Sequence, residues 1–429
     1  MTASSAPVSV RGDATGLTIP AHVDGLRKAG TAFLTEAFRT YGALARDNEV
    51  AAIERLEEVS GGSTGRKAVL TVRYAKPEPG ARTDLFVKFS RDFDDAVRDI
   101  GRTQMEAEAR FAALARTPGF PIAVPDTLFA DYHRESGTGL LISERIPFGR
   151  GDIEPQYHKC LDYEMPEQAE HYRALVTALA RLAGTERSGR LPARLVGQFP
   201  VDLQAATVGE RPTLTAERLD RKLTRLTEFV AQHPGLFAEN LRSPEFLRSF
   251  TAEAPELLGR EADVWRLLVE DADYLALCHW NANVDNAWFW RGEDGELRCG
   301  LMDWGCVSRM NVAMAVWGSL SGAETSLWNG HLDELLDLFC TEVSASGGPD
   351  LAPAALERRL VLYATLMGVT WLLDVPALIR KRLPDAGPDT TRTDPRIKND
   401  EGVRAPLQML NNVLNLWQTR GLSAALAEL

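Results

Sequence analysis

The first third of the chain mixes helical and strand-like patterns of hydrophobic residues. Apolar side chains recur at helical spacing from residue 21 onward, whereas Leu85 to Phe89 is a short apolar run typical of a buried strand. Glycine and proline residues separate these segments and indicate turns. The pattern predicts helices at 21–58 and 94–116, and strands at 68–74, 85–89, 126–131 and 139–145.

Long helical patterns dominate the chain after about residue 160. They predict helices at 166–187, 214–232, 244–258 and 261–270, and again after 310, apart from a polar loop at 384–400. Short strands are expected at 275–279, 287–290 and 297–302, with a glycine turn between the last two. We therefore predict an α+β protein with a flexible tail at 1–20, a small β-rich N-terminal lobe at 21–147 and a large, mostly helical C-terminal lobe at 148–429.

Composition places the chain among ordinary globular proteins, with 45% hydrophobic and 25% charged residues in a length of 429. The formal net charge of −12 argues against binding to nucleic acid or to anionic membranes, which requires clustered Lys and Arg. The sequence lacks the roughly 18–20 consecutive apolar residues of a membrane span and the apolar core of a secretory signal. We expect a cytoplasmic protein whose five cysteines, which form no CxxC pair, are buried thiols.

A glycine-rich turn precedes the strand predicted at 68–74 and contains Gly61, Gly62 and Gly65. The spacing of these glycines is not that of a P-loop, and the chain continues as a strand rather than as a helix. A glycine turn between two strands can direct backbone N–H groups toward phosphates. Most such turns are simple hairpins, so the turn alone has little predictive weight.

Lys88 lies inside the apolar strand predicted at 85–89. By itself, such a lysine is most simply explained as a solvent-facing residue on an edge strand. The glycine turn before it and the acidic helix after it favour a second interpretation, in which the lysine contacts nucleotide phosphates and pairs with a helix glutamate. Glu106 and Glu108 both lie on that helix but point in different directions, so only one can pair with Lys88, and we choose Glu108.

A third motif has the layout of a phosphotransfer site. His279 is followed by Asn281, and Asn286 comes five residues later. A predicted strand–turn–strand then leads to Asp303, which would bring Asn286 and Asp303 to one place. Phosphoryl transfer requires metal ions on the phosphates, a positioned acceptor and usually a carboxylate that takes the acceptor's proton. The order and spacing of these residues therefore indicate a kinase-like site.

These motifs resemble those of the superfamily of aminoglycoside phosphotransferases, choline kinases and ecdysteroid-type kinases, over about residues 55–320. The resemblance implies a two-lobed protein-kinase-like fold, ATP and Mg²⁺ as cofactors, and a small molecule as the acceptor. Asn286 and Asp303 would be metal ligands, and His279 would orient the loop. The nucleotide would be bound by Gly61, Gly62, Gly65, Lys88, Glu108 and the hinge strand that ends at Glu144.

Asn281 departs from the family pattern, which has an Asp at this position. A carboxamide cannot act as a general base, and general-base help contributes typically ~10²–10⁴-fold. Three interpretations stay open: the acceptor is already acidic and needs no base, Asp285 replaces the missing carboxylate, or the protein binds nucleotide without transferring phosphate. We predict a phosphotransferase, with an inactive kinase-like nucleotide-binding protein as the alternative.

Overall fold

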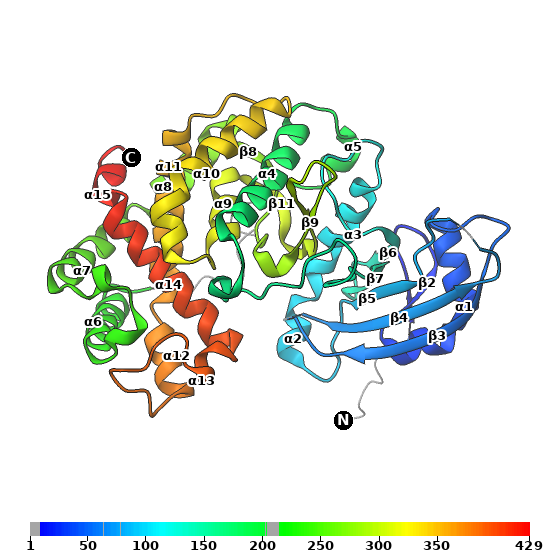
Figure 1. The fold of residues 1–429 in the computed structure, drawn as a ribbon, viewed down its shortest axis with the longest axis horizontal. Helices are drawn as coiled ribbons and strands as arrows, with labels where there is room; N and C mark the ends of the chain where they lie inside the picture. Colours follow the sequence, from blue (N-terminus) through cyan, green and yellow to red (C-terminus); the bar gives the residue numbers. More distant parts are fainter. Residues whose placement is uncertain (1–8, 63, 78, 202, 204–213) are drawn as a thin grey trace. The chain divides into compact units, whose positions relative to one another are not determined.

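The computed structural model describes residues 9–62, 64–77, 79–201, 203 and 214–429 (Figure 1). The chain divides into two compact units. Unit 1 consists of Met1–Arg150, Leu191–Phe199 and Gly300–Val307. Unit 2 consists of Gly151–Arg190, Pro200–Cys299 and Ser308–Leu429.

Unit 1 is built on a five-stranded antiparallel sheet with the strand order β3-β4-β5-β7-β6. The strands are β3 Val50–Val59, β4 Arg66–Tyr74, β5 Asp84–Phe89, β6 Thr127–His133 and β7 Thr138–Glu144. The predictions for β4, β5, β6 and β7 are confirmed to within a few residues. Because β5 is the central strand, the interpretation of Lys88 as a residue on an edge strand is wrong.

Helices cover both faces of this sheet. Leu140 and Ile142 of β7 lie in one core cluster with Phe38 of helix α1, Val23–Thr40. Leu141, which alternates with them, lies in a second cluster with Met105 of helix α3, Gln104–Ala115. Successive side chains of a strand point to opposite faces, so α1 and α3 cover opposite sides of the sheet. The short helices α2 Ala96–Ile100 and α5 Ala193–Val196 complete the helical part of the unit.

The helix predicted at 21–58 is wrong in its second half. Helix α1 ends at Thr40, and Gly42 follows with a φ of 72°. Residues Val50–Val59 form strand β3 instead, in register with β4 from Val50 opposite Tyr74 to Val59 opposite Lys67. The Ala, Glu and Leu residues of β3 favour a helix by themselves, but the pairing with β4 overrides this weak preference.

The N-terminal segment is ordered from residue 9 onward, so the prediction of a flexible tail at 1–20 is wrong for 9–20; residues 1–8 lie outside the described part of the chain. Strand β1, Ser9–Arg11, pairs with strand β2, Thr18–Pro20. The buried carboxylate of Asp131 accepts hydrogen bonds from the backbone N–H groups of Ala14, at 3.0 Å, and Thr15, at 2.9 Å. These bonds attach the turn between β1 and β2 to strand β6.

Unit 2 is mostly helical, as predicted. Its helices are α4 Gln168–Arg187, α6 Ala216–Gln232, α7 Pro244–Gly259, α8 Glu261–Glu270, α9 Val312–Leu320, α10 Thr325–Ala345, α11 Pro353–Met367, α12 Val375–Arg382, α13 Pro395–Lys398, α14 Glu401–Thr419 and α15 Leu422–Ala427. Helix α13 lies within the segment 384–400 that was predicted as a loop. Strand β8, Leu275–His279, pairs with β11, Val307–Asn311, and strand β9, Ala287–Arg291, pairs with β10, Leu297–Leu301.

Strand β8 is the structural support of the loop that follows it. It packs against α4 and α9, and its residues Ala276, Leu277, Cys278 and His279 are buried. The backbone N–H of Leu277 also donates to the carboxylate of Glu186 on α4, at 3.3 Å. His279 and the loop after it therefore start from a fixed position in the core of unit 2.

The predicted lobe boundary at 147 is close to Arg150, where the first segment of unit 1 ends. A single boundary does not describe the division, because unit 1 contains two later segments of the chain. Gly300–Val307, which carries Asp303, belongs to unit 1 rather than to the C-terminal lobe. The N–H of Leu301 donates to the carbonyl of Ala123 at 3.0 Å, and Trp304 stacks on Phe111 with a centroid distance of 3.7 Å. These contacts place a segment that is remote in sequence against α3.

A β-rich unit followed by a mostly helical one confirms the predicted α+β class. Among the described residues, no single helix is long and apolar enough to cross a membrane. One helix pair, Pro353–Leu372 with Val375–Arg382, passes that test only when its two parts, bent by 43°, are taken together.

Candidate functional site

Lys88 is the centre of a cluster of charged side chains in unit 1. Its ammonium Nζ lies 2.6 Å from Glu108 Oε1 and 2.8 Å from Asp303 Oδ1. The side chains of Lys88 and Glu108 are 13% and 9% exposed, whereas that of Asp303 is 51% exposed. The lysine is thus buried between one buried carboxylate and one that faces solvent.

Strand alternation explains why Lys88 reaches Glu108. Its neighbours Val87 and Phe89 lie in the core cluster under α1, so Lys88 points to the opposite face, which α3 covers. Glu106, two residues before Glu108 on α3, pairs instead with Arg110 and Arg134. The helix period directs the two glutamates to different partners.

The charges of this cluster influence one another. Burial lowers the pKa of Lys88, but the carboxylates of Asp303 and Glu108 outweigh this effect and raise the pKa above its usual value. Burial raises the pKa of Glu108, although Lys88 opposes this shift. Lys88 therefore carries a positive charge at neutral pH and is available to anionic phosphate oxygens if Asp303 exchanges its ion pair for another cation.

The glycine turn connects β3 to β4, and α2 holds it from outside. Arg98 donates to the carbonyl oxygens of Gly62 at 2.8 Å, Gly61 at 3.2 Å and Gly65 at 2.6 Å. Gly65 has a φ of 53°, and a Cβ at this position would lie 2.0 Å from the carbonyl oxygen of Phe89. Only glycine fits there, because the turn passes directly over strand β5.

Lys67 is a member of this site that the sequence analysis missed. It is the register partner of Lys88 on the neighbouring strand β4, so both side chains leave the same face of the sheet. Its ammonium donates to the carbonyl of Thr64 in the glycine turn. Burial lowers the pKa of Lys67 to about 8. The signal in the sequence was a second lysine directly after the glycine turn, at a strand position that faces the same side of the sheet as Lys88.

Lys67, Lys88, Glu108 and Asp303 line one narrow cavity of about 20 Å³ in unit 1. Its other lining residues include Thr64 of the glycine turn and Gly305, which follows Asp303. The charges of the two lysines and the two carboxylates balance formally, and the lysines are the groups here that can donate to an anion.

Asp303 carries a half-exposed carboxylate, a group that binds magnesium in proteins. It has a φ of 64°, an uncommon conformation for a residue with a side chain, and the stacking of Trp304 on Phe111 fixes the segment around it. Within the described residues there is no group of three or more His, Cys, Asp or Glu side chains that could hold a metal ion alone. Mg²⁺ bound together with a nucleotide uses only one or two carboxylates plus the phosphates, so a single half-exposed Asp fits this role.

The loop after β8, which belongs to unit 2, has a hydrogen-bond network of its own. The backbone N–H of Asn281 donates to Nδ1 of the buried His279 at 3.1 Å. Asn286 Nδ2 donates to the backbone carbonyl of Asn281 at 2.8 Å. His279 and Asn286 thus hold the backbone of Asn281 from both sides, and the side chain of Asn281 is left to other partners.

Two donors contact the side-chain oxygen of Asn281. Lys159 Nζ donates to Asn281 Oδ1 at 3.1 Å, and Asn283 Nδ2 donates to the same atom at 3.0 Å. Lys159 lies 122 residues earlier in the chain, and no pattern in the sequence indicated it. Burial is the main cause that raises the pKa values of Cys160 and Asp162, and the carboxylate of Asp285, which we considered as a substitute base, adds a smaller effect in the same direction.

The remaining predicted residue, Glu144, ends strand β7. Its carboxylate Oε2 lies 2.7 Å from Arg82 Nε, and its backbone N–H donates to the carbonyl of Asp126 at 2.8 Å. Burial raises the pKa of Glu144, while Arg82 opposes this shift. The carboxylate of Glu144 is therefore already paired with Arg82.

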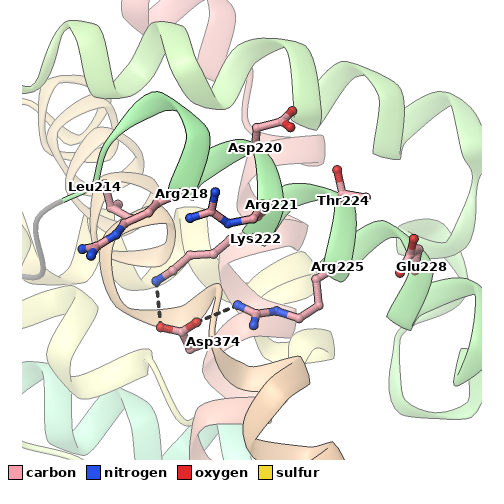
Figure 2. A pocket seen from close by; sticks show the side chains of 9 residues that line it. All are labelled: Leu214, Arg218, Asp220, Arg221, Lys222, Thr224, Arg225, Glu228 and Asp374. Carbon is pink, nitrogen blue, oxygen red and sulfur yellow. Dashed lines mark hydrogen bonds and ion pairs between the residues drawn. The ribbon is translucent and has the colours of Figure 1, made fainter.

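A separate open depression of about 820 Å³ lies on unit 2, along one face of helix α6 (Figure 2). Lys222 Nζ and Arg225 Nη2 each lie 2.7 Å from a carboxylate oxygen of Asp374. These ion pairs connect α6 to the start of α12. None of the candidate residues named above lines this depression.

No protein-family model and no protein of curated function matches the chain. Solved structures do match. A choline/ethanolamine kinase family protein from Mesorhizobium loti is 14% identical, with 87% of this chain and 91% of that chain covered and a TM-score of 0.40. A spectinomycin phosphotransferase in complex with ADP and spectinomycin is 9% identical, with 86% and 94% covered and a TM-score of 0.42. A microcompartment-associated aminopropanol kinase is 14% identical, with 91% and 98% covered and a TM-score of 0.40.

Proposed function

We propose that this protein is an ATP- and Mg²⁺-dependent phosphotransferase that acts on a small-molecule acceptor. The observation that carries the proposal is the position of Lys88 between Glu108 and Asp303 in a cavity below a glycine turn. In kinases, a strand lysine paired with a helix glutamate binds nucleotide phosphates, and a separate aspartate binds Mg²⁺. Each of these chemical groups has a candidate in unit 1.

The roles divide between the two units. Lys88 and Lys67 would bind phosphate oxygens, and Asp303 would hold Mg²⁺, which would neutralise charge on the phosphates. In unit 2, Asn286 is the other metal ligand that the sequence motif implies, and Asn281 would face the acceptor. His279 supports the loop by accepting from the backbone of Asn281. The glycine turn would cover the phosphates with its backbone N–H groups.

Binding of Mg-ATP is the first test. We expect Mg-ATP to raise the melting temperature of the wild-type protein, and the substitutions Lys88→Met and Asp303→Asn to remove most of this rise. The Asp303→Asn effect should require Mg²⁺, because ATP without metal does not use that carboxylate. Glu106→Gln is the matched control, since Glu106 lies on the same helix but pairs with arginines.

Transfer is the second test and separates the proposal from the alternative of a nucleotide-binding protein without activity. ADP formation is measured with Mg-ATP and a panel of small acceptors. Acceptor-dependent ADP formation that disappears in Asp303→Asn supports a phosphotransferase. Binding of Mg-ATP without transfer to any member of the panel would favour the inactive nucleotide-binding protein instead.

A further inference from the structure

The orientation of the Asn281 carboxamide follows from its two neighbours. An ammonium group only donates hydrogen bonds, so the atom 3.1 Å from Lys159 Nζ must be the carbonyl oxygen Oδ1 and not the amide nitrogen. Asn283 Nδ2 donates to the same oxygen at 3.0 Å. The NH₂ group of Asn281 therefore points away from Lys159 and Asn283, and within the described residues it has no hydrogen-bond acceptor.

Lys159 is held in place through its backbone and lies close to Gly322. Its carbonyl accepts from Arg404 Nε of α14 at 2.9 Å. A Cβ added to Gly322 would lie 3.4 Å from Lys159 Cγ and 3.2 Å from Asn283 Oδ1, so a glycine leaves room at this point. Across the described residues of unit 2, no carboxylate is within ion-pair distance of Lys159. Lys159 is thus not paired with a carboxylate at contact distance, although the carboxylates of Asp162 and Asp285 act on the adjacent Cys160.

An aspartate at position 281 would change this arrangement. Its carboxylate would form an ion pair with Lys159, which would lower the basicity of the carboxylate and neutralise the lysine. The asparagine instead keeps the positive charge of Lys159 available and offers N–H donors beside it. A site with a cation and N–H donors, and without a base, suits a nucleophile that is already deprotonated.

We propose that the acceptor is an oxyanion, either a carboxylate or a phosphate monoester, recognised by Lys159 and by the NH₂ group of Asn281. This inference rests on the proposed phosphotransferase activity. The acceptor oxygen forms a bond to the γ-phosphorus of ATP as the bond from that phosphorus to the β,γ-bridging oxygen breaks. The electron pair of the broken bond leaves with ADP. No proton is transferred, so no general base is required, and the product is an acyl phosphate or a diphosphate.

The test compares matched acceptors at saturating Mg-ATP. The carboxylates are acetate, succinate and L-glutamate, the phosphate monoesters are glycerol 3-phosphate and ribose 5-phosphate, and the hydroxyl acceptors are glycerol, ribose and ethanolamine. ADP formation is followed in each case. Hydroxylamine traps an acyl phosphate as a hydroxamate, and ³¹P NMR identifies a diphosphate, so the two anionic sources give different products. We expect transfer to one anionic class and none to the hydroxyl class.

Variants at Lys159 test recognition of the charge. Lys159→Met should raise the KM for the anionic acceptor by about 10-fold or more, because a charge-assisted hydrogen bond is lost. The Kd for Mg-ATP should stay unchanged, and Lys159→Arg should restore part of the loss. Lys398→Met is the control, since Lys398 is a lysine of the same unit that pairs with Glu164.

The outcomes separate the two proposals. Transfer to hydroxyl acceptors only, with no effect of Lys159→Met on KM, would overturn the oxyanion inference and leave the phosphotransferase intact. Binding of Mg-ATP without transfer to any member of the three classes would overturn the phosphotransferase and with it the inference. Transfer to an anion that depends on Lys159 supports both.

Discussion

Lys67 and Lys88 lie directly opposite each other on strands β4 and β5, yet only Lys88 is held by carboxylates. Lys67 contacts the carbonyl of Thr64 in the glycine turn, and burial lowers its pKa to about 8. Because Lys67 loses its proton near pH 8, the charge of the cavity that the two lysines line depends on pH. An incoming phosphate would favour the protonated form of Lys67.

The affinity for Mg-ATP should therefore depend on pH through Lys67. Because bound phosphate stabilises the ammonium, nucleotide binding is strongest below pH 8 and weakens as the pH rises above this value. Calorimetric titrations in buffers of different ionisation enthalpy should show proton uptake on binding near pH 8–9. Lys67→Met should remove this uptake, and the exposed Lys28→Met should retain it.

The same lysine should affect stability with a defined sign. The pKa of Lys67 is lower in the folded chain than in the unfolded chain, so the unfolded state binds more protons between about pH 8 and the unfolded value of 10.5. The contribution of Lys67 to the free energy of unfolding therefore rises with pH across this range. The melting temperature of Lys67→Met should exceed that of the wild type at pH 8. The two melting temperatures should approach each other above pH 10.

Glu108 and Glu106 offer a matched pair of substitutions on one helix. Glu108→Gln removes one of the two carboxylates that hold Lys88, and we expect a loss of Mg-ATP affinity corresponding to about 1.5–3 kcal/mol, the value of a hydrogen bond to a charged group. Glu106→Gln breaks contacts with Arg110 and Arg134 and should leave the affinity unchanged. Equal losses in both variants would contradict the role given to Glu108.

Arg98 should control the order of the glycine turn. It binds the carbonyl groups of Gly61, Gly62 and Gly65, and its Nε lies 3.1 Å from the buried carboxylate of Asp92. Arg98→Ala should increase the rate of hydrogen exchange at Gly61, Gly62 and Gly65 and weaken Mg-ATP binding roughly 10-fold, because the turn must then be ordered on binding. Arg102→Ala, which alters a neighbouring arginine, is the control; protection that stays the same in Arg98→Ala would refute this role.

Asn281→Asp should stabilise unit 2 while it impairs anion binding. The new carboxylate would face Lys159 at about the position of the present carbonyl oxygen, and its pKa would be lower in the folded state. The gain, about 1 kcal/mol, is present above the unfolded pKa of about 3.9 and is lost as the pH falls through the folded value. The melting temperatures of Asn281→Asp and the wild type at pH 7 and pH 3.5 measure this gain in stability. The double variant Lys159→Met/Asn281→Asp should lack the gain.

Local sequence patterns were sufficient to predict those elements whose residues favour the same secondary structure that the fold gives them. The apolar run Leu85–Phe89 predicted strand β5, and helical spacing predicted α4 and α8 to within a few residues. Strand β3 was missed because its Ala, Glu and Leu residues favour a helix, and its hydrogen-bonding partner β4 lies beyond the turn. Where local preference and long-range pairing disagree, the pairing decides.

By itself the sequence determined which residues are candidates for the site: the glycines of the turn, Lys88, the loop from His279 to Asn286, and Asp303. Only the tertiary structure decided how they are arranged. The central place of β5 in the sheet buries Lys88, the pairing of β4 with β5 adds Lys67, and the loop before α4 brings Lys159 to Asn281. The physical reason is that alternation and helical period act over a few residues, whereas strand order and contacts between distant segments depend on how the whole unit packs.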